Sequence, residues 1–197
     1  MSSIKLTADS GGGTFEIKAP SSSGNTRVLT LPDTHNLTLN GGKILQVVST
    51  TKTSTASTTS ATFADISGMS VSITPQSGTK VFVTCDLQLG AEDNSYGGFK
   101  LLRDSTMIGA GTEGTGNMSN ITFGDTFRGS FQFRVLGCGY QILDTHGANG
   151  STAVTYKLQW ASLYASRNVY LNRPHTADNN AYNIFGSSTI TAMEVAA

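Results

Sequence analysis

Apolar and polar residues alternate with a period of two along most of this chain. Over residues 81–89 the apolar side chains occupy every second position, and the same alternation recurs over 131–135 and 154–160. A period of two places the apolar set on one face of a strand and the polar set on the other. This pattern is typical of half-buried antiparallel strands rather than of a parallel sheet. No stretch of helical length is convincingly amphipathic, so the pattern predicts an all-β protein.

Residues 1–42 differ from the rest of the chain. They contain four short alternating pieces, at 4–6, 15–17, 28–31 and 37–39, separated by Gly-rich, Ser-rich and Pro-Asp turns. So few large apolar groups do not make a core, and segments of about 40 residues normally need a partner chain to fold. The sequence therefore predicts an N-terminal attachment or trimerisation segment that ends at Gly41-Gly42.

Residues 43–197 carry enough alternating segments for a core of their own. We count about eight to ten strands with turn signals between them, the spacing expected of a sandwich. The sequence predicts an antiparallel jelly-roll β-sandwich for this region. Residues 49–60 (STTKTSTASTTS) are interpreted as an extended surface strand, with a flexible linker as the alternative.

The charge content excludes some classes of partner. Only 13% of the residues are charged, and 13 basic side chains balance 13 acidic ones. No basic field is present to hold a phosphate backbone, so nucleic-acid binding is not expected. No apolar run approaches the ~18 residues of a membrane span, so membrane insertion is not expected either.

Motifs for catalysis or cofactor binding are weak. The hexapeptide GAGTEG at 109–114 has the letters of a dinucleotide-binding loop, but a loop-like segment and not a helix follows it. The triplet Asp-Thr-His occurs at 33–35 and 144–146, beside turn formers, without further metal ligands at a recognisable spacing. We therefore expect no catalytic residues, metal or cofactor, and no enzyme activity.

The two cysteines, Cys85 and Cys138, do not form a disulfide framework in a chain of this length. Cys85 alternates with apolar neighbours, as a small core residue does. A disulfide between the two is not expected.

Two loops carry planar rings next to amide and carboxylate groups, a combination that suits binding to sugars. They cover residues 91–98 and 173–183, and the second is long for a sandwich connection. Packing of Tyr182 and Phe185 on the core explains the longer loop equally well, and both interpretations stay open. The candidate receptor contacts are Asp93, Asn94, Tyr96, His175, Asp178, Asn180 and Tyr182.

The last predicted strand is apolar on both faces. Ile190 and Ala192 fall on one face, and Met193 and Val195 fall on the other. Such a strand must be covered twice, once by its own sandwich and once by a neighbouring subunit. These four residues are therefore the predicted trimer interface.

Several segments resemble the C-terminal heads of tail-fibre-like virion proteins from bacteriophages, especially marine phages of cyanobacteria. Residues 4–7, 18–20 and 29–32 resemble the attachment region of such fibres. The segments that resemble the heads are residues 43–48 (KILQVV), 63–75 (FADISGMSVSITP), 101–109 (LLRDSTMIG), 170–173 (YLNR) and 188–197 (STITAMEVAA).

The resemblance implies a homotrimer with a jelly-roll head similar to tumour-necrosis-factor-like trimers. It also implies attachment to other virion proteins through residues 1–42, location on the phage particle surface and assembly in the host cytoplasm. We expect a short head or tail fibre whose head contacts the host surface, with carbohydrate as the host partner. A capsid decoration protein and a jelly-roll carbohydrate-active enzyme are the alternatives.

Overall fold

The computed structural model describes residues 3–7, 14–18, 24, 44–117, 119–129, 132–164 and 166–196. The chain divides into two compact units, Met1–Leu39 and Asn40–Ala197. In the first unit, β1 (Ser3–Thr7) and β2 (Thr14–Lys18) form an antiparallel pair. The expected strands at 28–31 and 37–39, and the triplet at 33–35, lie outside the described residues.

The second unit, called the head below, is built from strands, and its described residues contain no helix. Three strands are only three residues long: β4 (Ala56–Thr58), β8 (Thr106–Ile108) and β12 (Val169–Leu171). The longer strands are β3 (Ile44–Lys52), β5 (Ala64–Ile73), β6 (Lys80–Ala91), β7 (Ser95–Arg103), β9 (Phe123–Phe127), β10 (Leu136–Asp144), β11 (Val154–Ser162) and β13 (Ser188–Val195).

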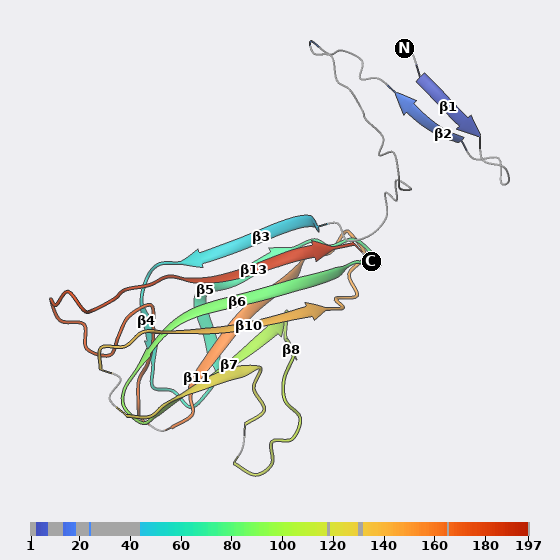
Figure 1. Ribbon diagram of the computed structural model, residues 1–197. Helices are drawn as coiled ribbons and strands as arrows, with labels where there is room; N and C mark the ends of the chain where they lie inside the picture. Colours follow the sequence, from blue (N-terminus) through green and yellow to red (C-terminus); the bar gives the residue numbers. More distant parts are fainter. Residues whose placement is uncertain are drawn as a thin grey trace, which may run out of the picture. The chain divides into compact units, whose positions relative to one another are not determined.

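These strands form two antiparallel sheets that face each other (Figure 1). The front sheet has the order β3-β13-β6-β10, with β12 and β4 continuing beside the far end of β6. The back sheet has the order β5-β11-β7, and both β8 and β9 pair with the free edge of β7. The first and last strands of the head are neighbours, and chain-distant strands pair in both sheets, as in a jelly roll. The prediction of an all-β jelly-roll sandwich is confirmed.

Alternation along the strands creates the core between the sheets. On β6, every second residue from Val81 to Leu89 is buried, and on β11 the same holds from Val154 to Trp160. Both runs were predicted from the sequence. Apolar side chains of this kind, once removed from water, each contribute roughly 1.5–3 kcal/mol to stability.

The alternating segment at 131–135 is not a strand, and this prediction is wrong. The described residues from Gln132 to Val135 form a turn and an irregular segment before β10 begins at Leu136. Phe133 is 39% exposed and makes an edge-on contact with the ring of Tyr182, 5.0 Å between ring centroids. The apolar residues here serve a surface cluster, which has no reason to follow the period of a sheet.

The Thr-rich segment at 49–60 is mostly extended, as predicted. Its first part completes β3, and its second part contains β4. The segment at 109–114 is a loop between β8 and β9, and Gly109 adopts a positive φ of 64°. A helix does not follow it, so the geometry that a dinucleotide requires is not formed.

A partly buried ion pair joins the two sheets. Arg103 of β7 donates from Nη1 to both carboxylate oxygens of Asp144 on β10, at 2.8 and 3.0 Å. The hydroxyl of Tyr156 on β11 donates to Oδ2 of the same carboxylate at 2.7 Å. Burial, and after it the contact with Asp144, raises the pKa of Tyr156. We call these three side chains the sheet clasp.

Candidate interaction surface

Strand β13 is covered on one face by its own chain. Ile190 and Ala192 are fully buried in the core between the sheets. Met193 and Val195 point to the opposite side, the outer face of the front sheet, where they are partly exposed. Because Ile190 and Ala192 already pack inside one chain, only Met193 and Val195 of the four predicted interface residues are available for contact with another subunit.

The register of the front sheet builds an apolar row across four strands. Met193 lies opposite Val47 of β3 and opposite Phe82 of β6, and Phe82 lies opposite Leu143 of β10. Val47 and Leu143, at the two ends of the row, are 55% and 50% exposed. The four side chains therefore lie side by side on the outer face.

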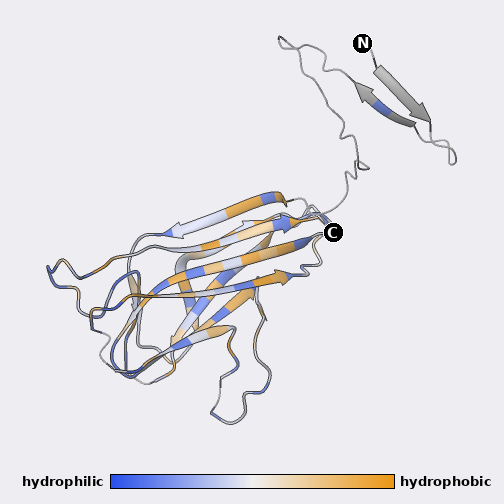
Figure 2. Cartoon of the chain, in the orientation of Figure 1, coloured by the Kyte–Doolittle hydropathy of each residue, from blue (hydrophilic) through white to orange (hydrophobic). Residues whose placement is uncertain are grey.

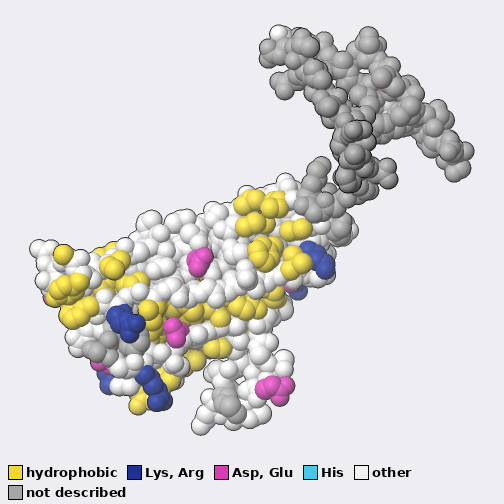
Figure 3. Space-filling model, in the orientation of Figure 1, with side chains coloured by type: hydrophobic (Ala, Val, Ile, Leu, Met, Phe, Trp, Pro, Cys, Tyr) yellow, Lys and Arg dark blue, Asp and Glu magenta, His cyan; other side chains and the backbone are white. Residues whose placement is uncertain are grey.

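The row continues toward the end of the sheet where the chain enters the head. Val195 pairs with Ile44 on one side and with Lys80 on the other, and both Ile44 and Leu45 are exposed. Figure 2 shows β3 hydrophobic at its start and pale toward its end. Figure 3 shows the hydrophobic side chains gathered near the C-terminus on this face. We call the outward-facing residues of β3, β13, β6 and β10 the association face.

Beyond the apolar row, the association face becomes polar but stays almost uncharged. The hydroxyls of Ser49 and Thr191 hydrogen-bond each other across the strands at 2.8 Å. Thr84 and Gln141 extend this second row across β6 and β10. Among the outward-facing residues of the four strands, Lys80 and Asp86 alone carry a charge.

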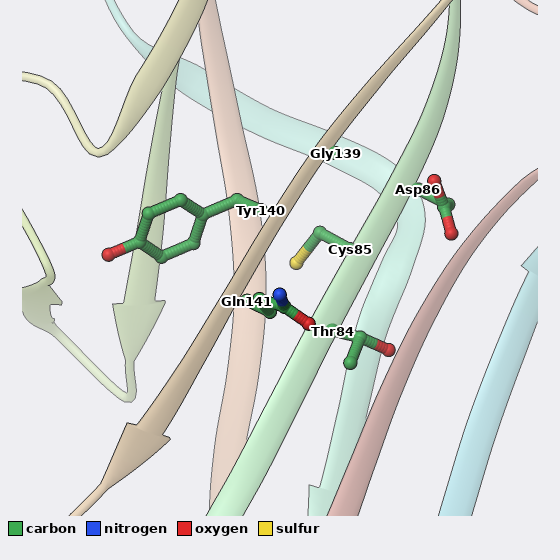
Figure 4. Close-up of a pocket in the computed structure, with 6 residues that line it drawn as sticks. All are labelled: Thr84, Cys85, Asp86, Gly139, Tyr140 and Gln141. Carbon is green, nitrogen blue, oxygen red and sulfur yellow. The ribbon is translucent and has the colours of Figure 1, made fainter.

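A shallow pocket of about 510 Å³ interrupts the polar part of this face (Figure 4). Gly139 on β10 leaves room there, and the carboxylate of Asp86 leans toward it. The lining consists of Thr84, Cys85, Asp86, Gly139, Tyr140 and Gln141. The side chain of Cys85 belongs to the core cluster and that of Tyr140 packs against it, so the polar character of the pocket comes from the other side chains.

The outer face of the back sheet has a different chemistry. Lys157 forms an ion pair with Asp65 at 2.8 Å, and Gln159 donates to the same carboxylate at 2.7 Å. The hydrogen bonds from Lys157 and Gln159 lower the pKa of Asp65. The ammonium of Lys100 lies 4.0 Å from the centre of the Phe63 ring. The outer face of the back sheet therefore carries charged side chains of the kind expected on a solvated surface. The lack of charge is specific to the association face and is not a property of the whole head.

The first group of candidate receptor contacts lies between β6 and β7. Asp93 and Asn94 form the turn there, and Asn94 has a positive φ of 59°. Tyr96 begins the outward side of β7, and its hydroxyl accepts hydrogen bonds from Nε and Nη2 of Arg128 at 3.2 and 2.9 Å. Glu92, just before the turn, accepts a hydrogen bond from Asn168 at 2.7 Å.

The second group lies in the loop between β12 and β13. Nδ1 of His175 is 3.0 Å from the hydroxyl of Tyr170, so the imidazole is half-buried and packed against that ring. Nearby Glu92 contributes, after burial, to the raised pKa of Tyr170. The structure thus joins the two predicted loops through Tyr170, which the sequence did not single out.

The rest of this loop is held by its own side chains. Asn180 and Asn183 both donate to Asp178, which leaves that carboxylate engaged within the loop. Tyr182 is exposed and packs against Phe133. Ile184 and Phe185 are also exposed, at 63% and 58%. Of the two interpretations left open for this loop, packing of Tyr182 and Phe185 on the core is not what the structure shows, because both rings lie on the surface.

Sequence reasoning missed most of the association face. Phe82 and Leu143 are each one apolar residue among polar neighbours on the outer side of a strand, and they join Val47 of β3 only in the folded sheet. They form a row only through the pairing of strands that are far apart in the chain. The start of β3 did contain a signal, because Ile44, Leu45 and Val47 are more apolar residues than one inward-facing side of a strand requires.

The remaining candidate groups have structural partners. Nδ1 of His146 accepts a hydrogen bond from the backbone of Ala148 at 2.8 Å, and Nε2 lies 3.2 Å from the Thr79 hydroxyl. Within the described residues, no three His, Cys, Asp or Glu side chains are grouped as metal ligands are. In that same part of the chain, no helix is long and apolar enough to cross a membrane.

Both cysteines are free thiols on adjacent strands. Burial, together with nearby Asp86, raises the pKa of Cys85 to about 12. Burial, together with nearby Asp125, raises the pKa of Cys138 to about 11. At neutral pH both therefore remain protonated, which makes them poor nucleophiles.

No protein-family model and no curated protein matches this chain. Two of the solved structures that match it come from infectious bursal disease virus. The structure of the Gx strain has a TM-score of 0.39 and 10% identity, over 93% of this chain and 46% of that chain. A mutant VP2 protein from T=1 particles has a TM-score of 0.39 and 11% identity, over 98% and 44%. This chain spans less than half the length of either, and at such a TM-score the likeness carries no argument about function.

Proposed function

We propose that this chain is a structural protein of a phage virion, a short homotrimeric fibre anchored by residues 1–42. The observation that carries the proposal is the association face. This face has few charged residues and several exposed large apolar residues. The centre of a subunit interface has the same composition. The residues concerned are Ile44, Leu45, Val47, Phe82, Leu143, Met193 and Val195.

The position of the apolar row favours parallel packing of the copies. The row lies at one end of the face and the Ser/Thr rows occupy the middle, so antiparallel copies would place apolar side chains against hydroxyls. Parallel copies bring the apolar rows together at one level, and burying apolar surface against apolar surface is favourable. Parallel packing brings the starts of all the β3 strands to one end, as anchoring through residues 1–42 requires. The number of copies, three, is the one that the resemblance to phage fibre heads implies.

In this arrangement the opposite end of the head is free for a partner outside the virion. The turn at Asp93 and Asn94 and the loop with His175, Asp178, Asn180 and Tyr182 lie at the end of β6 away from Ile44 (Figure 1). Repeating these loops in each copy would raise the avidity of weak contacts with a cell surface. The residues proposed to form the trimer and the loops proposed to contact the cell surface thus lie at opposite ends of β6.

The substitution Met193→Asp tests the association face. We expect the wild-type chain to scatter light as an oligomer of three times 20.6 kDa, and the variant to scatter as a monomer. An aspartate at position 193 would put an unpaired charge into a dry interface, which costs several kcal/mol. Ser70→Asp, on the exposed outer face of the back sheet, is the matched control and should remain trimeric.

A wild-type mass near 20.6 kDa at micromolar concentration would contradict the proposal outright. If the wild type is trimeric and both Met193→Asp and Val47→Asp stay trimeric, the trimer uses another surface. Circular dichroism of each variant separates dissociation from unfolding.

A further inference from the structure

The loop between β12 and β13 is fastened to the head near its two ends. The backbone N–H of Thr176 donates to the backbone oxygen of Gln132 at 2.8 Å, and that of Gly186 donates to the backbone oxygen of Asn172 at 3.2 Å. Figure 1 shows this loop at the end of the head away from the C-terminus. Between the two fastenings, the loop is held by three of its own side chains, called the amide cluster below: Asp178, Asn180 and Asn183.

Side-chain and backbone oxygens converge in the amide cluster. Nδ2 of Asn180 donates to Oδ2 of Asp178, and Nδ2 of Asn183 donates to Oδ1 of the same carboxylate. The backbone oxygen of Asp178 accepts from Nδ2 of Asn183 at 2.7 Å and from the backbone N–H of Asn180 at 2.9 Å. One carboxylate, two side-chain amides and a backbone carbonyl are therefore within direct reach of one another.

One oxygen of the amide cluster has no hydrogen-bond donor. Oδ1 of Asn183 is buried from solvent, and no described group donates to it. It shares a carbon atom with the Nδ2 that contacts Asp178, so it lies close to that carboxylate. Buried polar atoms normally have a partner, and a bound ion is one of the partners that can supply it. A cation shared by this oxygen and the carboxylate would give a partner to both.

We infer that the amide cluster binds Ca²⁺, an inference that rests on the proposed function, in which this loop contacts the cell surface. Ca²⁺ prefers oxygen ligands from carboxylates, side-chain amides and backbone carbonyls, and it accepts irregular geometry. The cluster offers all three kinds of ligand: the carboxylate and backbone oxygen of Asp178, and the amide oxygens of Asn180 and Asn183. Water completes the coordination shell, as it commonly does for this ion.

The chemistry of these ligands selects among cations. Zn²⁺ and related metals favour nitrogen and sulfur ligands, and the imidazole of His175, earlier in the loop, is engaged with Tyr170. Mg²⁺ demands near-ideal octahedral geometry and gives up its waters reluctantly, which suits an irregular loop poorly. Because Asp178 supplies the one negative charge of the cluster, the affinity belongs in the weak range of about 10⁻⁴–10⁻³ M.

Bound Ca²⁺ restrains the part of the loop that carries Tyr182. This residue precedes Asn183 in the chain, and its ring packs against Phe133. A loop held in one conformation before it meets a partner loses less entropy on binding. The concentration of Ca²⁺ thus controls how well this loop is prepared for the proposed contact with the cell surface.

The test is isothermal titration calorimetry of the full chain with CaCl₂, after a chelating resin has removed metal ions. We expect about one Ca²⁺ per chain, and binding of MgCl₂ weaker by about tenfold or more. Asp178→Asn removes the carboxylate of the cluster and should abolish binding. Asn183→Asp adds a second carboxylate and should tighten binding about tenfold, because affinity rises with the charge of the ligands. Glu113→Gln removes a charge from another exposed loop and should bind as the wild type does.

Absence of Ca²⁺ uptake at ~10 mM CaCl₂ would overturn the inference. Unchanged affinity in Asp178→Asn or in Asn183→Asp would overturn it too, with circular dichroism to verify that each variant is folded. Light scattering of the same samples keeps this result apart from the proposed function. A trimer that takes up no Ca²⁺ contradicts only the cation site, whereas a monomer that takes up Ca²⁺ contradicts only the trimeric fibre.

Discussion

Asn172 shows how much of the head depends on one polar side chain. It is fully buried with a positive φ of 63°, a conformation that asparagine tolerates better than most residues. Its Nδ2 donates to the backbone oxygens of Lys52 and Ser54, and its Oδ1 accepts from the Ser188 hydroxyl at 2.6 Å. One amide thus ties the end of β12 to the β3–β4 connection and to the start of β13.

Replacing Asn172 by Asp keeps the shape but turns both donated hydrogen bonds into contacts between oxygen atoms. Each buried polar group left without a partner costs about 1–3 kcal/mol, so we expect a loss of at least ~2 kcal/mol in the free energy of unfolding. The measurement is denaturation by urea. Asn149→Asp makes the same change in an exposed loop, where Oδ1 only accepts hydrogen bonds, and should alter stability by less than ~0.5 kcal/mol. Equal stability of the two variants would mean that the Asn172 network is dispensable.

At the scale of elements, the sequence predicted features that depend on one strand alone. It did not predict features that depend on the pairing of strands far apart in the chain. Alternation located β6 and β11, because each buries a single face against the same core. The same rule failed at Phe133, whose neighbours serve a surface contact with Tyr182. It also gave no sign of the sheet clasp, since Arg103, Asp144 and Tyr156 come from three strands that only the folded topology brings together.

The surroundings of Tyr96 were only half visible in the sequence. Tyr96 was singled out from its loop, but its partners Arg128 and Leu163 lie just after β9 and just after β11. Their approach depends on the pairing of β7 with β9 on one side and with β11 on the other, which a local pattern cannot report. Conversely, His175 and Asp178 were plausible surface contacts by residue type, yet the structure shows both engaged with neighbours in the head.

The sheet clasp is the element-scale feature that is easiest to test. Arg103→Met would leave the carboxylate of Asp144, which is 7% exposed, without its cation. Breaking a buried ion pair on one side costs about 3–5 kcal/mol, and because Arg103 is itself partly exposed we expect about 3. Adding Asp144→Asn to this variant removes the unpaired charge and should restore part of the loss. A double variant no more stable than Arg103→Met would show that the ion pair is not the source of the effect.

At the scale of the whole molecule, the core that the described residues form lies in the second unit. Its buried apolar residues run from Ile66 to Ala192, whereas the described part of the first unit is a single pair of five-residue strands. A two-stranded pair is marginally stable at best in water. The two parts should therefore differ sharply in their ability to fold alone.

We expect a chain that begins at Gly41 to fold as a soluble β protein with a cooperative thermal transition, and residues 1–40 alone to be unfolded. Circular dichroism of both pieces is the measurement. Aggregation of the shorter chain under conditions where the full-length protein is well behaved would place the boundary elsewhere. A folded peptide of residues 1–40 would show that this segment needs neither other copies nor a virion surface.

The pairing of Ile44 with Val195 has a consequence for the connectivity of the head. The two ends of residues 44–196 lie on neighbouring strands, so a few added residues would close the chain into a ring. New ends could then be opened in the exposed connection between β8 and β9, with every strand still in its place. Such circular permutation is tolerated where termini are close and the new cut lies in a surface loop. Chains that begin and end at different places could thus form the same two sheets.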